Sequence, residues 1–436
     1  MIRKFFTSLV LIALSINSYS QNSTSSPYSF YGIGSLDFRG TTENRSMGRL
    51  SVYNDSIHMN FKNPASYTGK NLFIFNDEGR LVKFTVGLNY SETKLSSNNQ
   101  NSLASNTSFD YLGLNLPMGK FGMALGLIPY SSVGYKLESS SDINLIKYKY
   151  EGLGGVNKAF LGFAYQISNN VSIGFDAKYN FGNIQNGAIE FLYDDDDQPL
   201  DYQSKETNRS DLSGINFNFG LIYSGIIFKE YTLHGSFTYS PSYDLSSINN
   251  RTFAAVIYNS NTGLDFPINQ IEVDLESLNL YKTDLVMPYR LNFGIGIGKS
   301  KKWFVGSEIT LMNSSIFSND LINIENSKFE DSFLVSLGGF YIPDYASFNR
   351  FFDRVVYRSG IYFEQTGLNI NNQSINEFGI SFGFGIPAGG LFSNINTSFE
   401  FGKRGTKKAD LVEETFTNIH ISLSLNDRWF IKRKYN

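Results

Sequence analysis

The chain has 436 residues, 16% of them aromatic, and a mean hydropathy of -0.20, which is too polar for a bundle of membrane helices. The net charge of -3, with Lys and Arg dispersed along the chain, argues against nucleic-acid binding. The absence of cysteine excludes disulfides, thiol catalysis, cysteine-based zinc sites and a lipid-modified N-terminal cysteine. A barrel of membrane-spanning strands remains compatible with this composition, because half of each strand can be polar.

The first twenty residues predict a signal peptide. Arg3 and Lys4 supply the positive start, Phe5 to Ile16 form the apolar run, and Ser18 and Ser20 occupy the small-residue cleavage positions. These twenty residues are therefore expected to be removed when the protein is secreted.

Residues 21–79 alternate poorly and contain Gly, Ser, Asn and Pro with scattered apolar side chains. They precede the first clear strand, so they either extend into the periplasm or fold into a barrel as a plug. A wide barrel leaves more interior than its own side chains can fill. We therefore expect residues 21–79 to form an N-terminal hatch in the lumen.

From about residue 80 onward the dominant period is two, which is typical of strands with one apolar face. Residues 171–181 show it best, with Val, Ile, Phe, Ala, Tyr and Phe on one face and Ser, Gly, Asp, Lys and Asn on the other. Several such segments reach ten residues or more, which suits a tilted strand that crosses a bilayer better than a strand of a soluble sandwich. The fold class is therefore predicted to be all-β, a transmembrane antiparallel β-barrel over residues 80–430.

The spacing predicts fourteen strands, and an even number closes a single-chain barrel. The connections alternate between short turns and long loops at 92–108, 132–152, 184–212 and 243–285. Because bacterial barrels have short periplasmic turns, both ends of the barrel are expected in the periplasm, with residues 431–436 as a periplasmic tail. The predicted strands are 81–91, 109–117, 121–131, 153–167, 171–183, 213–224, 231–240, 286–298, 303–312, 329–341, 354–364, 375–387, 393–404 and 415–425.

A motif in the N-terminal segment resembles the hatch signature of FadL-like outer-membrane transporters. It consists of Met47-Gly48, the acidic Asp55 and then Asn63-Pro64-Ala65. The chain departs from the family at Arg49 and Leu50, where small residues are usual, and at Ser66, where Gly is common. The C-terminal third, from Tyr341 to Phe430, is similar to a branch of these barrels found in Bacteroidota.

The resemblance implies a fourteen-stranded barrel with an N-terminal hatch, through which hydrophobic molecules such as long-chain fatty acids diffuse. In the family they leave sideways, at an inward kink of the third strand. Pro129 lies in the third strand predicted here, and proline cannot donate a ladder hydrogen bond. We expect a wall opening or bulge near Pro129, and the alternative is that Pro129 only ends the strand at the external rim.

The phase of the strands places two kinds of side chain inside. Charges of both signs are expected to pair with one another or with the hatch, which disfavours a general ion pore. Apolar inward residues need a dry partner, which is either the hatch or a hydrophobic ligand. The inward charges are Lys83, Asp176, Lys178, Glu308, Arg358, Glu377 and Glu400, and the predicted apolar lumen lining is Ile128, Ile222, Phe304, Leu334, Phe340 and Tyr362.

Other constellations are weaker. His234 and Ser236 share an inward face, but no residue can be assigned to orient the histidine, so a lumen hydrogen bond is favoured over catalysis. Gly298-Lys299-Ser300 ends like a phosphate-binding loop but has Phe293 where that motif needs glycine. The acids Asp194 to Asp197 lack calcium-loop spacing and suggest a solvated loop tip. The sequence predicts no enzyme, no metal and no cofactor.

The leading hypothesis is a passive channel for hydrophobic small molecules in the outer membrane of a Gram-negative bacterium. Residues 21–79 are the hatch and Pro129 marks the gate. The alternative is a non-transporting barrel subunit of an outer-membrane protein assembly or secretion complex. The expected partners are outer-membrane lipids, with hydrophobic small molecules under the first hypothesis and other outer-membrane or periplasmic proteins under the second. Nucleic acid is not among them.

Overall fold

The computed structural model describes residues 24–36, 38–68, 80–98, 100–140, 145–228, 230–259, 262–318, 326–388 and 393–429. The predicted signal peptide 1–20 and tail 431–436 lie outside these ranges, as does the end of the predicted hatch at 69–79.

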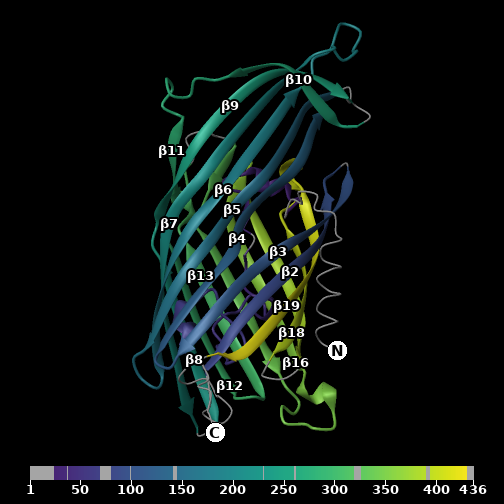
Figure 1. The fold of residues 1–436 in the computed structure, drawn as a ribbon. Coiled ribbons are helices and arrows are strands. Elements are labelled where there is room, and N and C mark those ends of the chain that lie inside the picture. The colour runs from purple at the N-terminus through teal and green to yellow at the C-terminus, as the bar shows by residue number, and fades with distance from the viewer. Residues whose placement is uncertain are drawn as a thin grey trace, which may run out of the picture.

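The wall is one antiparallel sheet that closes on itself where β19 pairs with β2 (Figure 1). Three positions in the wall each hold two consecutive strands, which are β8 with β9, β11 with β12, and β14 with β15. The barrel therefore has fourteen strand positions, as predicted. The wall strands are β2 (Arg80–Ser96), β3 (Asn101–Met118), β4 (Phe121–Ser140), β5 (Ile146–Gln166), β6 (Val171–Glu190), β7 (Gln203–Ile227), β8 (Tyr231–Ser240), β9 (Tyr243–Asn259), β11 (Lys282–Met287), β12 (Arg290–Lys299), β13 (Trp303–Met312), β14 (Ser327–Phe329), β15 (Ser332–Tyr341), β16 (Val356–Ile370), β17 (Gln373–Pro387), β18 (Asn394–Arg404) and β19 (Glu413–Trp429), and β10 (Leu264–Glu272) extends β9 beyond the rim.

The outward face carries the apolar stripe that the period of two predicted. On β7 the exposed side chains include Ile215, Phe217 and Phe219, while their neighbours Asn216 and Asn218 are buried inside. No helix in the described part of the chain is long and apolar enough to cross a membrane. The apolar outer face and the closed sheet together establish a transmembrane β-barrel of the outer membrane.

The strands are longer than predicted, and the expectation of long loops was wrong in most places. Only residues 97–100 separate β2 from β3, although a loop was expected over 92–108. The expected loop at 184–212 is largely strand, because β6 and β7 stay paired up to Glu190 and Ser204. Outside the bilayer a ladder needs only backbone hydrogen bonds, so polar segments extend a strand without any apolar alternation to reveal it.

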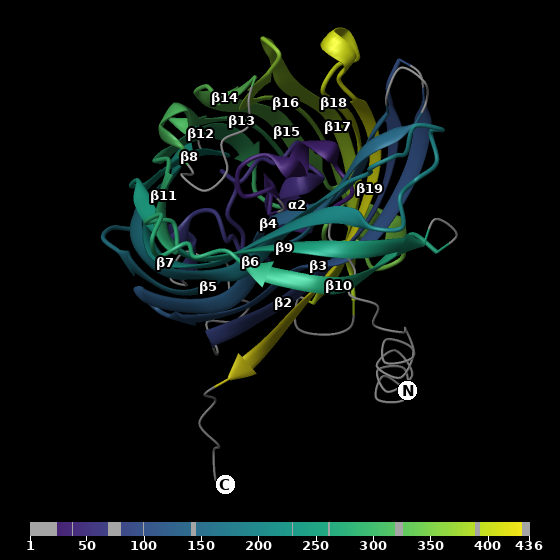
Figure 2. The same cartoon turned by 90° about the horizontal axis from the view of Figure 1, so that it is seen from above.

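The described residues of the segment 24–68, which are 24–36 and 38–68, lie inside the barrel, in purple in Figure 2. It contains little regular structure, and its short elements contact β4, β5, β6, β7 and β18. Its elements are η1 (Pro27–Phe30), β1 (Ser35–Leu36), α2 (Thr42–Arg45) and η2 (Pro64–Tyr67), and the connections of the wall add η4 (Ser314–Ile316), η5 (Phe351–Arg354) and η6 (Lys408–Asp410). We call residues 24–68 the hatch.

The outward stripe makes a prediction about stability. Replacing Phe219, which lies at the middle of the apolar stripe of β7, by Arg should lower the free energy of unfolding in lipid vesicles by about 2–4 kcal/mol, because a charge then faces hydrocarbon. Urea titration followed by tryptophan fluorescence and heat-modifiable gel mobility measures this loss.

The matched control is Ser213→Arg, on the same face of β7 but beyond the end of the stripe. It should cost about 0–1 kcal/mol. Equal losses for both variants would show that the stripe does not face lipid.

Candidate functional site: the hatch and the opening in the wall

The Met47-Gly48 step of the hatch docks directly on the backbone of the wall. A Cβ on Gly48 would lie 2.6 Å from the carbonyl oxygen of Ile361, and Gly48 has a positive φ of 66°. On the wall side, a Cβ on Gly338 or Gly360 would lie 2.2 Å from Met47 backbone atoms. The glycines on the inner face of β15 and β16 therefore make room for this part of the hatch.

The Asn63-Pro64-Ala65 step docks in the same way on β6 and β7. A Cβ on Gly174 would lie 2.3 Å from the Ala65 nitrogen, and one on Gly220 would lie 2.1 Å from Asn63 Oδ1. The Asn63 side chain accepts a hydrogen bond from the Ala65 N–H at 3.0 Å and donates to the Leu221 carbonyl at 3.1 Å. Both parts of the hatch motif are thus contact points with inward glycines.

The guanidinium of Arg49 lies at the centre of a buried ion cluster. It donates to Glu364 at 3.0 Å and to Glu377 and Glu400 at 2.6 Å each, and it stacks 3.6 Å from the ring centroid of Tyr362. Burial alone would lower the pKa of Arg49, but the surrounding carboxylates raise that pKa well above its usual value. The charge of Arg49 therefore persists and ties the hatch to β16, β17 and β18.

A second ion cluster connects the hatch with β3 and β19. Arg45 Nη2 lies 3.0 Å from Asp110 Oδ1, and the buried ring of His420 lies 3.5 Å from Asp110 and 3.7 Å from Glu400. The remaining hatch contacts include Ser51, whose N–H donates to Glu308 at 2.7 Å. Ion clusters thus anchor the hatch on several sides of the barrel.

Most of the predicted inward charges pair as expected. Lys83 donates to the hatch carbonyl of Asp55 at 2.9 Å, and Lys178 lies 3.5 Å from Asp176. Glu308, Glu377 and Glu400 bind the hatch as described above. Arg358 lies on the wall and donates to Asn396 Oδ1 at 3.2 Å.

Asp55 organises the hatch turn that follows it. Its carboxylate accepts from the backbone N–H of Ile57 at 2.8 Å and lies 2.6 Å from His58 Nδ1. Burial would raise the pKa of the Asp55 carboxyl, but His58 and Lys83 outweigh burial and hold this pKa well below its usual range. Asp55 is therefore a structural anion of the hatch.

The wall is open beside β4. The ladder between β3 and β4 begins where Met118 pairs with Phe121 and ends where Leu112 pairs with Leu127, whereas β4 continues to Ser140. On the other side, pairing with β5 is irregular between Pro129 and Ser131. Pairing through residues 126–131 is thus interrupted on both sides, and Pro129 does not end its strand.

The first part of the hatch, residues 24–36, lies across this opening, and we call it the strap. Towards β4, Ser35 and Leu36 pair with Ser132 and Ser131. Towards β3, Ser25 Oγ accepts from Asn106 Nδ2 at 2.9 Å. The strap thus contacts both of the strands that fail to pair with each other.

An apolar cavity of about 120 Å³ lies behind the strap, in the external half of the barrel. Its lining includes Tyr130, the residue at the irregularity of β4, and the cationic side chains of Arg39 and Arg404, both of which pair with glutamates. Its remaining apolar lining is provided mainly by Tyr28, Tyr31, Ile33, Leu36, Met287, Phe317, Phe329 and Leu368.

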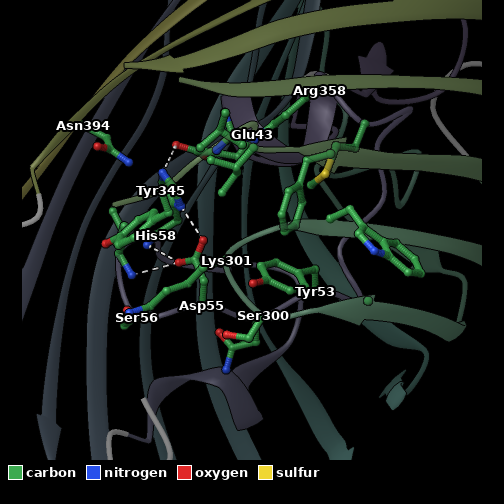
Figure 3. Close-up of a pocket in the computed structure, with 18 of the residues that line it drawn as sticks. Glu43, Tyr53, Asp55, Ser56, His58, Ser300, Lys301, Tyr345, Arg358 and Asn394 are labelled. Carbon is green, nitrogen blue, oxygen red and sulfur yellow. Dashed lines mark hydrogen bonds and ion pairs between the residues drawn. The ribbon is translucent and has the colours of Figure 1, made fainter. Parts of the chain in front are cut away.

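A second cavity of about 430 Å³ lies between the hatch and the periplasmic turns (Figure 3). On one side of it His58 lies 3.7 Å from Glu43 and 2.6 Å from Asp55. The buried Arg358 lines the cavity together with the aromatic rings of Tyr53 and Tyr345. The two cavities share no lining residue, so the body of the hatch separates them.

The six apolar residues predicted to line the lumen are all buried. Ile128 packs with Met59 and Phe61 of the hatch, and Phe304 and Phe340 pack with Met47 and Leu50. The Tyr362 hydroxyl donates to Glu400 at 2.5 Å and lies 3.0 Å from Glu377, beneath Arg49. Ile222 and Leu334 are buried but belong to neither apolar cluster. The hatch is thus the dry partner of three of them, whereas Tyr362 belongs to the Arg49 ion cluster.

The structure also describes the surroundings of two of the weaker constellations. His234 packs between Tyr53 and Phe304, with its Nδ1 3.3 Å from Ser224 Oγ. Asp194 accepts the backbone N–H groups of Asp196 and Gln198 in an exposed turn. Within the described ranges no group of three or more acidic or histidine side chains is arranged to hold a metal ion.

Sequence reasoning missed the partners that make the hatch clusters. From the sequence, Arg49 was noted only as a position where the chain departs from the FadL-like hatch signature, and neither Glu364 nor Asp110 was predicted to contact the hatch. Glu364 has the same inward phase along its strand as Arg358 and Tyr362, so the alternation pattern could have identified it. Asp110 sits at a register shift between β2 and β3, which no alternation pattern reveals.

The Arg49 cluster predicts how the hatch is held. Replacing Arg49 by Met keeps most of the side-chain volume but leaves three buried glutamates without their shared cation, which should cost about 3–5 kcal/mol of hatch stability. Hydrogen exchange should then become faster at the amides of residues 42–66.

The control is Arg209→Met, which breaks the half-exposed pair with Asp211 outside the lumen. That pair is worth about 0–1 kcal/mol, so hatch exchange should not change. Unchanged exchange in Arg49→Met as well would show that the ion cluster does not hold the hatch.

Solved structures that resemble this fold include two toluene transporters and a FadL homologue. The toluene transporter TodX of Pseudomonas putida has a TM-score of 0.56 at 15% identity, covering 91% of this chain and 99% of that chain. A FadL homologue of Pseudomonas aeruginosa has a TM-score of 0.55 at 11% identity, covering 91% and 100%. The toluene transporter TbuX of Ralstonia pickettii has a TM-score of 0.54 at 15% identity, covering 89% and 98%. At such identities the likeness establishes the FadL-like fold.

No curated protein matches the sequence. One family model does, under the description BamG, and it matches residues 1–436. Since that match spans the whole chain, the protein belongs to the BamG family.

Proposed function

We propose that the protein is a passive outer-membrane channel for small hydrophobic molecules, which leave the barrel sideways between β3 and β4. The observation that carries this proposal is the opening in the wall directly beside an apolar cavity. Tyr130 belongs to both, because it lies at the irregular step of β4 and lines the cavity. No catalysis is needed for such a route.

The size of the cavity favours a compact substrate. Its volume of about 120 Å³ is close to that of the roughly 150 Å³ apolar cavities that accept benzene. A long-chain fatty acid would fit only if the strap moved, and its carboxylate could then reach Arg39 or Arg404. We therefore expect monoaromatic hydrocarbons to pass more readily than long-chain fatty acids.

A covalent lock on the strap tests the route. The chain has no cysteine, so a disulfide between Ser35→Cys and Ser132→Cys, which are paired residues, would join the strap to β4 without competing thiols. Oxidation should reduce toluene and oleate uptake by cells to the level of cells that lack the protein, and a reductant should restore uptake.

The control pair is Ser204→Cys with Ala255→Cys, which are opposed on β7 and β9 away from the opening. Its oxidation should leave uptake unchanged. If the locked strap transports as well as the control, or if the unlocked protein transports nothing, the lateral route is wrong.

A second function is favoured by the ion clusters that hold the hatch. A barrel with its hatch tied by Arg45 and Arg49 can serve as a rigid, non-transporting subunit of an outer-membrane assembly or secretion complex. Mild detergent extraction followed by native mass measurement separates the two functions. Stoichiometric protein partners together with absent uptake favour the subunit, whereas a lone barrel with uptake favours the channel.

A further inference from the structure

The sheet continues far beyond the membrane at β9 and β10, at the top of Figure 1. The lipid-facing stripe of β7 gives way to Ser213, Asp211 and Arg209 beyond Ile215. Phe253 of β9 pairs with Glu206 of β7, nine residues past Ile215. At about 3.3 Å per residue this is roughly 30 Å along the strand, so this part of the sheet lies outside the bilayer.

One face of this extension is apolar and exposed. Phe253 is directly opposite Ile271, and Ile257 is directly opposite Phe266, so the four side chains form two cross-strand pairs on one face. Their exposed fractions are 44%, 69%, 43% and 53% respectively. Lipid cannot cover them at this height, and contiguous exposed apolar patches on proteins generally mark interaction sites.

The adjoining edge of the sheet is free. β10 pairs with β9 on one side and, within the described residues, with no strand on the other. Its backbone N–H and C=O groups therefore offer a template on which another strand can pair. The irregularity between Pro267 and Asn269 limits this template to two short stretches.

Charge indicates what kind of partner fits. Residues 264–281 contain four acidic residues and no Lys or Arg. Asp265 pairs with Lys205, but Glu272, Asp274 and Glu276 form no ion pair with another described residue. A second copy of this chain would bring the same acids to the edge and be repelled, so the edge favours a basic partner.

We propose that the exposed face of β9 and β10, with the free edge of β10, docks a different protein outside the cell. The partner supplies an extended segment whose apolar side chains cover Phe266 and Ile271 and whose Lys or Arg residues face Glu272, Asp274 and Glu276. This inference goes beyond the proposed channel and does not depend on transport.

Photo-crosslinking in the native outer membrane tests the surface. A photoreactive phenylalanine analogue placed at Phe266 of the full chain should crosslink to one other protein, and mass spectrometry should map the attachment to a segment with alternating apolar residues and Lys or Arg. The matched position is Phe217, on the lipid-facing stripe of β7, which should give no such product. Attachment only to lipid, to a second copy or to an acidic segment would overturn the proposal, as would no product at Phe266.

Variants give an independent measurement. Phe266→Asn combined with Ile271→Asn alters only exposed side chains, and heat-modifiable mobility checks that the barrel still folds. Recovery of the crosslinked protein with the purified variant should fall by about tenfold or more. Glu272→Lys with Glu276→Lys should weaken recovery as well, and full recovery by both variants would refute the docking surface.

Discussion

The buried charge of Arg49 is the constraint on which the lumen depends. Its guanidinium is shared by Glu364, Glu377 and Glu400, which come from three neighbouring wall strands. Separately, each of these charges would be costly in the interior, because an unpaired buried ion loses its hydration. Together they require a hatch in one position, and the hatch in turn requires the glycines on the inner wall that let its backbone approach.

The hatch and the wall are therefore one structural unit. Met47-Gly48 lies against Gly338 and Gly360, and Asn63-Pro64 lies against Gly174 and Gly220. Inward-facing aromatic side chains of the wall pack against apolar side chains of the hatch and fill the remaining space. This packing places the body of the hatch between an external apolar cavity and a periplasmic mixed one, which share no lining residue.

The opening itself follows from how β4 is paired. Its ladder with β3 stops at Leu127, its ladder with β5 is irregular at Pro129, and the strap supplies only two residues of replacement pairing at Ser35 and Leu36. A two-residue pairing is weak beside the continuous ladders elsewhere, such as the one that joins β19 to β2. Among the described residues, the opening is thus held with fewer backbone hydrogen bonds than the seam between β19 and β2.

The sequence alone determined the barrel, its fourteen strand positions and the buried inward phase of residues such as Phe304 and Tyr362. These follow from a period of two, which is a local property of the chain. It also marked Pro129 as a place where pairing could fail, because proline lacks the N–H that a ladder needs. Tertiary structure decided the rest. The length of β7 beyond the bilayer depends on polar residues that carry no alternation, and the cluster around Arg49 joins residues more than 300 positions apart. Which inward charge meets which hatch residue depends on the register of the closed sheet, and no single strand contains that information.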